Sequence, residues 1–310
     1  MNTLTEAIND YVSLRQALGF KLVQVEGLLK NFATFMVTQG RCWVSTELAL
    51  QWAIQPIGAQ PASWAKRLTA VRGFARYRSA TDARTQIPER GLLPSRSRRA
   101  KPHLYTEEEI ANLLAAARAL KSDSGLRGHT HYCLFGLLAV TGLRISEAIG
   151  LQRQDVDLQQ GLLTIRGAKF GKSRLVPLHH STQGVLEQYA KRRDAQFAHP
   201  VAANFLVSER GKALRASTVR ETFCQLSVQT GLRAPADRTG PRLHDFRHRF
   251  ATETLLRWYR SGEDIERRLP ALSTFLGHSR TSNTYWYISA CPELMGEAAR
   301  RLQRRWEKSA

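Results

Sequence analysis

The sequence is poor in cysteine and in acidic residues, and it has no long apolar run. Its four cysteines, Cys42, Cys133, Cys224 and Cys291, lie far apart and form no CxxC pair. This spacing predicts reduced thiols in a reducing compartment. It indicates neither a disulfide framework nor a zinc site, and we expect no bound metal.

The most apolar run, HYCLFGLLAVTGL, extends from His131 to Leu143. It has about 13 residues, whereas a helix that spans a bilayer needs about 20. We therefore expect a buried core helix here and no membrane-spanning segment. The first residues, MNTLTEAIND, contain no basic region followed by an apolar stretch. We expect no secretory signal and a cytoplasmic protein.

Acidic residues are scarce relative to basic ones: 26 Asp and Glu stand against 46 Lys and Arg, a net charge of +20. This imbalance costs the compact protein self-repulsion unless a polyanion relieves it, so nucleic acid is the expected partner. A membrane surface is not expected, because the cations are spread along the chain. The hydrophobic content of 43% over 310 residues excludes collagen-like and disordered chains and suffices for one large core or two.

The first part of the chain, residues 1–92, carries helical patterns. Thr3 opens a capping-box pattern, apolar residues recur at helical spacing over residues 25–36, and Ser45 can cap a third helix. A fourth helix is expected after Pro61. These patterns predict a small helical bundle.

The fourth of these helices is strongly basic. Between its apolar positions it carries five cations, namely Lys66, Arg67, Arg72, Arg76 and Arg78. Such cations either form a solvated surface or contact DNA phosphates, and the charge of the whole chain favours DNA contact.

Residues 93–103, LPSRSRRAKPH, combine prolines, serines and cations without apolar periodicity, which predicts an interdomain linker. Beyond it, Thr106 precedes three glutamates that suit a helix N-terminus. After Gly161, the strings LLTIRG and RLVPL flank a basic turn, which predicts a β-hairpin. Further helices are expected after residue 182 and over residues 217–230, 244–260 and 282–290. The fold class is therefore mainly α with a small β-sheet (α+β).

Residues suited to phosphate binding recur in this second part. Arg144 lies at the entry to a helix, where backbone N–H groups can join its guanidinium. His244 and Arg247 lie three residues apart and can converge on one phosphate from a single helix face, whereas we expect His248 and Arg249 to point elsewhere.

A Gly-containing helix end, Leu276-Gly277-His278, follows, and Tyr287 comes nine residues after His278. The strings TGLRISEAIGL, GAKFGKSRLVPL, LHDFRHRFAT and LGHSRTSNTYWY thus resemble, in order, the signatures of the tyrosine recombinase (phage-integrase-like) family. The resemblance covers the whole chain, and TYWYISACPELM is similar to recombinases of transposons and plasmids. It implies a SAM-like helical core-binding domain in residues 1–92 and a catalytic domain in residues 104–310, with a C-terminal interaction tail from about residue 292.

Carried over residue by residue, the resemblance implies a catalytic set of six: Arg144, Lys169, His244, Arg247, His278 and Tyr287. It assigns Glu147 as the acidic residue that supports the first arginine. Lys169 and Lys172 both lie on the hairpin turn. Counting back from RLVPL favours Lys169 for catalysis and leaves Lys172, with the cations of the fourth helix, for DNA binding.

These residue types supply what phosphodiester cleavage requires. The two arginines stay charged and clamp the phosphate, and His278 donates a further hydrogen bond. Lys169 is the candidate acid toward the 5′ oxygen, and His244 is the candidate base for the Tyr287 hydroxyl, whose ordinary pKa is about 10. A 3′-phosphotyrosyl bond would store the energy of the broken linkage, so rejoining needs no ATP and no cofactor is expected.

Tyr285 is the competing nucleophile. Two residues on a helix that are two positions apart lie about 200° apart around it, so Tyr285 and Tyr287 cannot both face the phosphate. Only the nine-residue spacing, which comes from the resemblance, selects Tyr287. We expect Tyr285 and Trp286 to be packing residues.

The resemblance implies double-stranded DNA with inverted-repeat core sites as the partner. It also implies a homotetramer on two DNA sites, and a monomer or weak oligomer when free. The tail from Pro292 either folds back on its own domain or is donated to a neighbouring protomer. The expected function is site-specific recombination in integration, transposition or resolution of a mobile element. The alternatives are a catalytically silent DNA-binding regulator and a type IB topoisomerase-like enzyme.

Overall fold

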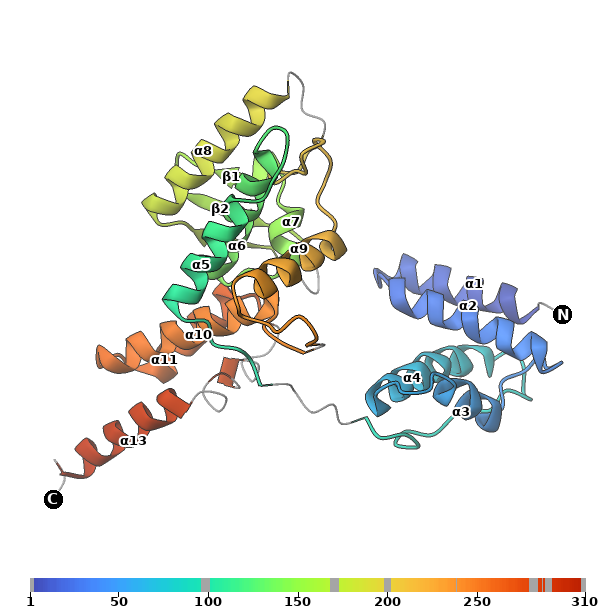
Figure 1. Ribbon diagram of the computed structural model, residues 1–310. Coiled ribbons are helices and arrows are strands. Elements are labelled where there is room, and N and C mark those ends of the chain that lie inside the picture. The colour runs from blue at the N-terminus through green and yellow to red at the C-terminus, as the bar shows by residue number, and fades with distance from the viewer. Residues whose placement is uncertain are drawn as a thin grey trace. The chain divides into compact units, whose positions relative to one another are not determined.

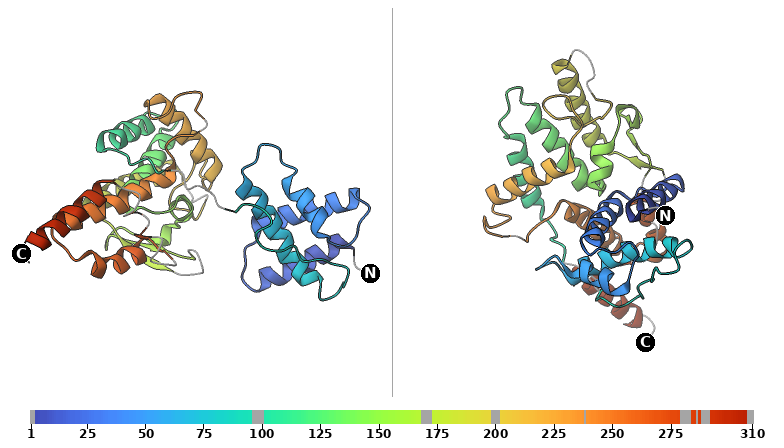
Figure 2. Two further views of the ribbon diagram at one scale, coloured as in Figure 1. Left: turned by 90° about the horizontal axis from the view of Figure 1, so that it is seen from below. Right: turned by 90° about the vertical axis from the view of Figure 1, so that its right-hand side faces the viewer.

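The computed structural model describes residues 3–95, 101–167, 173–197, 202–237, 239–278, 284–285, 287 and 292–307. The chain forms two compact units, Met1–Ala100 and Lys101–Ala310 (Figures 1 and 2). The division between them falls inside residues 93–103. Within the described residues, no helix combines the length and the apolarity that crossing a membrane requires.

The first unit is a bundle of helices: α1 (Leu4–Ala17), α2 (Val23–Thr38), α3 (Thr46–Ile54) and α4 (Pro61–Arg78). A capping box starts α1, because the Thr3 side chain accepts from the Glu6 N–H and the Glu6 carboxylate accepts from the Thr3 N–H. Aromatic residues fill the core between the helices; Phe32 and Trp52, for example, meet edge to face with ring centroids 5.1 Å apart.

The helices of the second unit are α5 (Glu107–Arg118), α6 (Leu126–Thr141), α7 (Ile145–Gly150), the 3₁₀ turn η1 (Arg153–Asp155), α8 (His180–Gln196), α9 (Ala216–Gln229), α10 (Leu243–Arg260), α11 (Ile265–Phe275) and α13 (Pro292–Glu307). Strands β1 (Val156–Asp157), β2 (Leu162–Ile165) and β3 (Arg174–Pro177) form an antiparallel sheet in the order β1-β2-β3, with Leu163 opposite Val176. The predicted hairpin is the β2–β3 pair. The prediction of a mainly α fold with a small sheet is confirmed.

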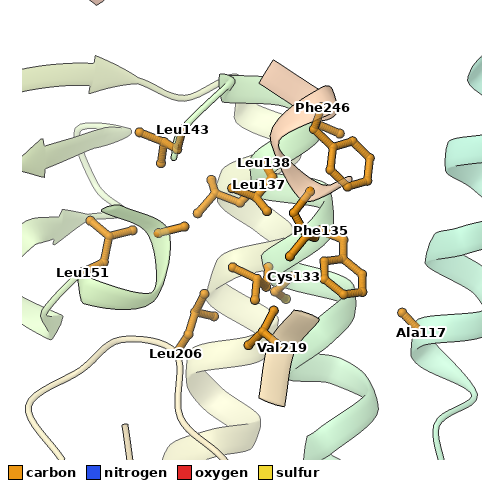
Figure 3. Close-up of a cluster of buried hydrophobic side chains, with 14 of the residues drawn as sticks. Ala117, Cys133, Phe135, Leu137, Leu138, Leu143, Leu151, Leu206, Val219 and Phe246 are labelled. Carbon is orange, nitrogen blue, oxygen red and sulfur yellow. The ribbon is translucent and has the colours of Figure 1, made fainter. Parts of the chain in front are cut away.

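The main core of the second unit is built around α6, which contains most of the run predicted to be a buried helix. Phe135, Leu137 and Leu138 of α6 pack with Val219 of α9 and Phe246 of α10 (Figure 3). Gly142 ends α6 with a φ of +62°, a conformation that suits glycine. The chain therefore turns sharply into α7 and places Arg144 at the start of that helix.

A second apolar cluster joins α10, α11 and the C-terminal helix α13, which lies beside α10 (Figure 2). Leu294 near the start of α13 is fully buried in this cluster. Farther along, Arg301 donates to the carbonyl oxygens of Glu263 and Gly262 at 2.8 and 3.2 Å. The helix is thus held against its own domain, although Trp306 near its end is exposed.

Candidate active site

Arg144 is held at the N-terminus of α7 by bonds at both ends of the residue. Its backbone N–H donates to Glu147 Oε2 at 3.0 Å, and its guanidinium donates to Glu147 Oε1 at 2.7 Å and to the carbonyl oxygen of Gly277 at 3.0 Å. These bonds fix the backbone and the guanidinium of Arg144, and Glu147 partly balances its charge. Arg144 is therefore a preorganised cation.

Arg174 of β3 is a site residue that the sequence analysis missed. Its guanidinium donates to both carboxylate oxygens of Glu147, at 3.1 and 2.9 Å, and to the carbonyl oxygen of Phe275 at 2.7 Å. Burial raises the pKa of Glu147, but the bonds and charges of Arg174 and Arg144 outweigh it and lower that pKa to about 2. Glu147 is thus a carboxylate that is charged at neutral pH and shared by two arginines.

Arg247 lies inside the domain, with only 1% of its surface exposed. It donates from α10 to the carbonyl oxygen of Gly142 at 2.8 Å and to that of Leu276. Burial lowers its pKa to about 10, and interaction with Tyr287 partly opposes the shift. At neutral pH Arg247 remains a cation, as its predicted role requires.

The three arginines meet at one short stretch of backbone. Arg174, Arg247 and Arg144 donate to the carbonyl oxygens of residues 275, 276 and 277 respectively. A Cβ on Gly277, whose φ is +64°, would lie 2.7 Å from an Arg174 nitrogen. The glycine is therefore required both by the backbone conformation and by the close approach of the guanidinium.

His278 follows directly and faces the predicted nucleophile. Its Nδ1 lies 2.8 Å from the Thr284 hydroxyl, and its ring is stacked on that of Tyr287 with centroids 5.9 Å apart. Burial, together with the positive charges of Arg247 and Arg144, lowers the pKa of His278 to about 3. The imidazole is neutral at pH 7 in the DNA-free protein.

The expectation that His248 points away from the site was wrong. Its ring lies 4.8 Å from that of His244 and 5.3 Å from that of Tyr287, centroid to centroid. Residues four apart share a helix face, so the spacing of His244 and His248 was the signal that could have found it. Arg249 does turn away, since it donates to the carbonyl oxygen of Tyr105.

Both histidines of α10 have lowered pKa values. Partial burial and the charge of Arg247 lower that of His244. Burial, followed by the neighbouring His244, lowers that of His248 to about 4. His244 is exposed at the start of α10 while His248 is buried. A neutral imidazole is thus available at the surface of the site, in the form that a general base must have.

The structure separates the two candidate tyrosines. Tyr287 is 3% exposed and lies against the rings of His248 and His278, whereas Tyr285 is 51% exposed. The expectation that Tyr285 is a packing residue was therefore wrong, because about half of its surface is exposed. Trp286, Lys169 and Lys172 lie outside the described residues.

Of the five cations of α4 predicted to contact DNA, Arg78 lies 3.7 Å from Asp82 of its own unit, and the other four fall into two groups. Lys66 and Arg76 are exposed. Arg67 stacks over the Trp52 ring at 3.7 Å and donates to the Trp52 carbonyl oxygen, and Arg72 donates to the carbonyl oxygens of Pro88 and Glu89. The second group thus stabilises the fold of its own unit.

Metal ligation finds no support in the part of the chain that the structure describes, where no group of three or more His, Cys, Asp and Glu side chains could hold an ion. The described site instead combines three arginines, neutral imidazoles and a buried tyrosine. Such a set can bind an anion, stabilise added negative charge and offer a hydroxyl nucleophile.

Comparison with known proteins identifies the family to which the chain belongs. The sequence model of the phage integrase family matches residues 104–293. The chain is 52% identical over 311 residues to y4rB of Sinorhizobium fredii, described as an integrase/recombinase, with 99% of each chain covered. It is 32% identical over 237 residues to the tyrosine recombinase XerD of Caulobacter vibrioides, covering 76% of this chain and 73% of XerD.

Solved structures share the fold. The integrase of transposon Tn1549, in complex with transposon right end DNA, superposes with a TM-score of 0.66 at 18% identity and covers 96% of this chain and 98% of that one. A lambda integrase tetramer bound to a Holliday junction gives 0.65 at 16% identity, covering 92% and 77%. The resemblance seen in the sequence is confirmed: the chain belongs to the phage integrase family of tyrosine recombinases, enzymes that break and rejoin DNA.

Proposed function

We propose that this protein is a site-specific recombinase of a mobile element and that it works through a 3′-phosphotyrosyl intermediate. The observation that carries the proposal is the position of Tyr287, which is buried against His248 and His278 and interacts with Arg247. A buried tyrosine among cations and neutral imidazoles is poised for attack on an anion, because its hydroxyl is oriented and its developing charge is stabilised.

In this mechanism Arg144 and Arg247 bind the non-bridging oxygens of the scissile phosphate. His244 accepts the Tyr287 proton, and His278 donates a hydrogen bond to the phosphate as negative charge builds on it. Lys169 protonates the departing 5′ oxygen, with Lys172 on the same predicted turn as the alternative. The phosphodiester bond breaks as the phosphotyrosyl bond forms, and the reverse attack by a 5′ hydroxyl releases the tyrosine without added energy.

Assembly follows from the same proposal. Double-stranded DNA with inverted-repeat core sites would present two cleavage points to two protomers, and two such DNA sites would bring four protomers together. The lambda integrase tetramer on a Holliday junction is an assembly of this kind in a protein of the same fold. The exposed Trp306 and Leu302 of α13 are the apolar residues that contact with a neighbouring protomer would cover. The DNA substrate makes the cytoplasm the place of action.

Covalent trapping tests the proposal. Wild type, Tyr287→Phe and the matched control Tyr285→Phe are each mixed with a randomised pool of duplex DNA and quenched in SDS, and the DNA left on the protein is sequenced. Wild type and Tyr285→Phe should yield adducts that share one sequence, and Tyr287→Phe should yield none.

Two results would contradict the proposal. Adducts that survive in Tyr287→Phe and vanish in Tyr285→Phe would move the nucleophile to Tyr285. Sequence-specific DNA binding by all three proteins without any adduct would favour the silent regulator.

A further inference from the structure

A cavity of about 480 Å³ adjoins the catalytic residues of the second unit. Arg144 at the start of α7 and His244 at the start of α10 form one of its walls. Arg220 and Phe223 of α9 and Arg233, from the segment that follows α9, form the others. The cavity therefore shares two residues with the proposed scissile-phosphate site, and its other lining residues include arginines outside that site.

The lining of this cavity is strongly cationic. It includes the arginines Arg144, Arg220, Arg233 and Arg242, and none of the described lining residues is acidic. Arg144 and Arg242 are compensated from outside the cavity by Glu147 and Asp245 at 2.7 and 2.8 Å. Arg220 is exposed and forms no ion pair with any residue that the structure describes. The positive charge of Arg220 is therefore not balanced by any acidic residue that the structure describes, and an anion can bind at this surface.

Arg233 is fixed in place before any ligand binds. It donates to the carbonyl oxygen of Pro241 at 2.8 Å, and a Cβ at position 240 would lie 2.9 Å from its Nε, so Gly240 permits this close packing. Phe223 and Leu243 add apolar surface beside the arginines. Fixed donors next to an apolar wall suit a phosphate attached to a sugar, since the ring can pack while the oxygens are bound.

We propose that this cavity binds a second phosphate of the DNA strand, next to the phosphate that is cleaved, and that Arg220 and Arg233 are its ligands. The inference rests on the proposed function, which places the scissile phosphate on Arg144 and His244. Successive phosphates of one strand advance by about 3.4 Å along the duplex, so a neighbouring phosphate lies close to the shared wall. Binding this neighbouring phosphate would fix the position of the scissile phosphate relative to Tyr287.

Single-phosphate neutralisation tests the subsite. Duplex DNA is chosen by binding selection with the Tyr287→Phe protein, so the test does not depend on cleavage. Each phosphate of the selected site is then replaced in turn by a neutral methylphosphonate, and affinities are measured for the Tyr287→Phe protein with and without Arg220→Gln. Arg192→Gln is the matched control, because Arg192 is exposed on α8 and does not line the cavity.

Neutralising one phosphate beside the centre of cleavage should weaken binding about tenfold in the parent and in Arg192→Gln, and less than about twofold in Arg220→Gln. The slope of log affinity against log salt should fall by about 0.9 in Arg220→Gln, the value for one lost phosphate contact. Identical neutralisation profiles with and without Arg220→Gln would overturn the proposal, whether or not the protein cleaves DNA.

A phosphate site could also serve a free anion. The DNA-free protein is therefore heated in inorganic phosphate and in chloride at equal ionic strength. If phosphate raises Tm in the parent but not in Arg220→Gln, and the neutralisation profiles coincide, the occupant is a free anion and the DNA assignment is wrong. A difference between the neutralisation profiles assigns the site to the DNA strand.

Discussion

The arginines of α4 and the arginines of the candidate active site make the same kind of bond, but their surroundings differ. Arg67 and Arg72 donate to backbone carbonyl oxygens, as Arg144 and Arg247 do. Arg67 contacts the ring of Trp52 and the backbone carbonyl oxygen of Trp52. Around Arg247, three histidines and a tyrosine gather, and each of those histidines has a lowered pKa.

The difference shows that a half-buried arginine on a carbonyl oxygen is not by itself a functional site. Its bonds to the backbone fix the guanidinium in either case. What marks the second set is the convergence of titratable groups on the same point from several elements of the chain.

The strongest test of this difference replaces one arginine of each set, α4 and the candidate active site, by lysine. Arg247→Lys should lower the rate of adduct formation at saturating DNA by about 10²–10³, because a fixed donor to the developing charge is lost. Arg67→Lys should leave that rate unchanged. An equal loss of rate in both variants would mean that the two sets do not differ in role.

The next largest effect concerns stability and the Glu147 carboxylate, which pairs with both Arg144 and Arg174. Arg174→Met should destabilise the second unit by about 3 kcal/mol, because it removes one partner of a buried ion pair. Hydrogen exchange of α10 and α11 in urea measures the loss. Adding Glu147→Gln to Arg174→Met should recover part of it, and a purely additive double variant would show that the pair is not coupled.

Lowering the pH should destabilise the second unit and not the first, and we expect the contribution of His248 to be smaller than the effect of Arg174→Met. His248 has a pKa of about 4 in the folded protein and about 6.5 when unfolded, so the unfolded chain binds more protons as pH falls. The stability that neutral His248 contributes is present above pH 6.5 and declines as the pH drops toward 4. Between pH 6.5 and 5 the protonation of His248 alone should cost the second unit on the order of 2 kcal/mol, and His278, whose pKa is also lowered, should add to this loss.

His248→Gln should flatten this slope, even if it lowers stability at every pH. The first unit serves as the internal control, since the described residues 3–95 include no histidine. A slope that is unchanged in His248→Gln would assign the acid sensitivity to other groups.

The smallest expected effects lie on α4 itself. Arg67→Gln should cost the first unit about 1 kcal/mol, through the lost stacking on Trp52 and the lost hydrogen bond, with the salt dependence of DNA binding unchanged. Lys66→Gln should leave stability within about 0.5 kcal/mol and lower the salt slope by about 0.9. The reverse pattern would make Arg67 the DNA contact.

The sequence predicts those features that local rules determine. The Thr3 capping box forms as its spacing indicates, Thr106 caps α5 as predicted, and the apolar run from His131 becomes the central helix. The six predicted catalytic residues were assigned from the family signatures, which occur in the usual order along the chain. Within it, the structure brings together the members it describes, and Tyr287 is buried while Tyr285 is not.

Other features depend on partners distant in the chain and could not be predicted. Arg174 stands in a short strand, and its partners lie 27 residues before it and 101 after it. Strand β1 has only two residues, too few for any alternation to appear. Lys66 and Arg67 are adjacent cations, and only the position of Trp52 decides which of them is drawn into the fold.

The arginines that meet at residues 275–277 have a consequence for how the protein is made. Arg144 reaches its carbonyl partner across 133 residues, Arg174 across 101 and Arg247 across 29. A chain emerging from the ribosome carries all three guanidiniums before it carries the backbone that organises them. Because these long-range bonds cannot form before the end of α11 is made, the proposed anion-binding centre forms late. A nascent or truncated chain that stops short of that point has cations but no site.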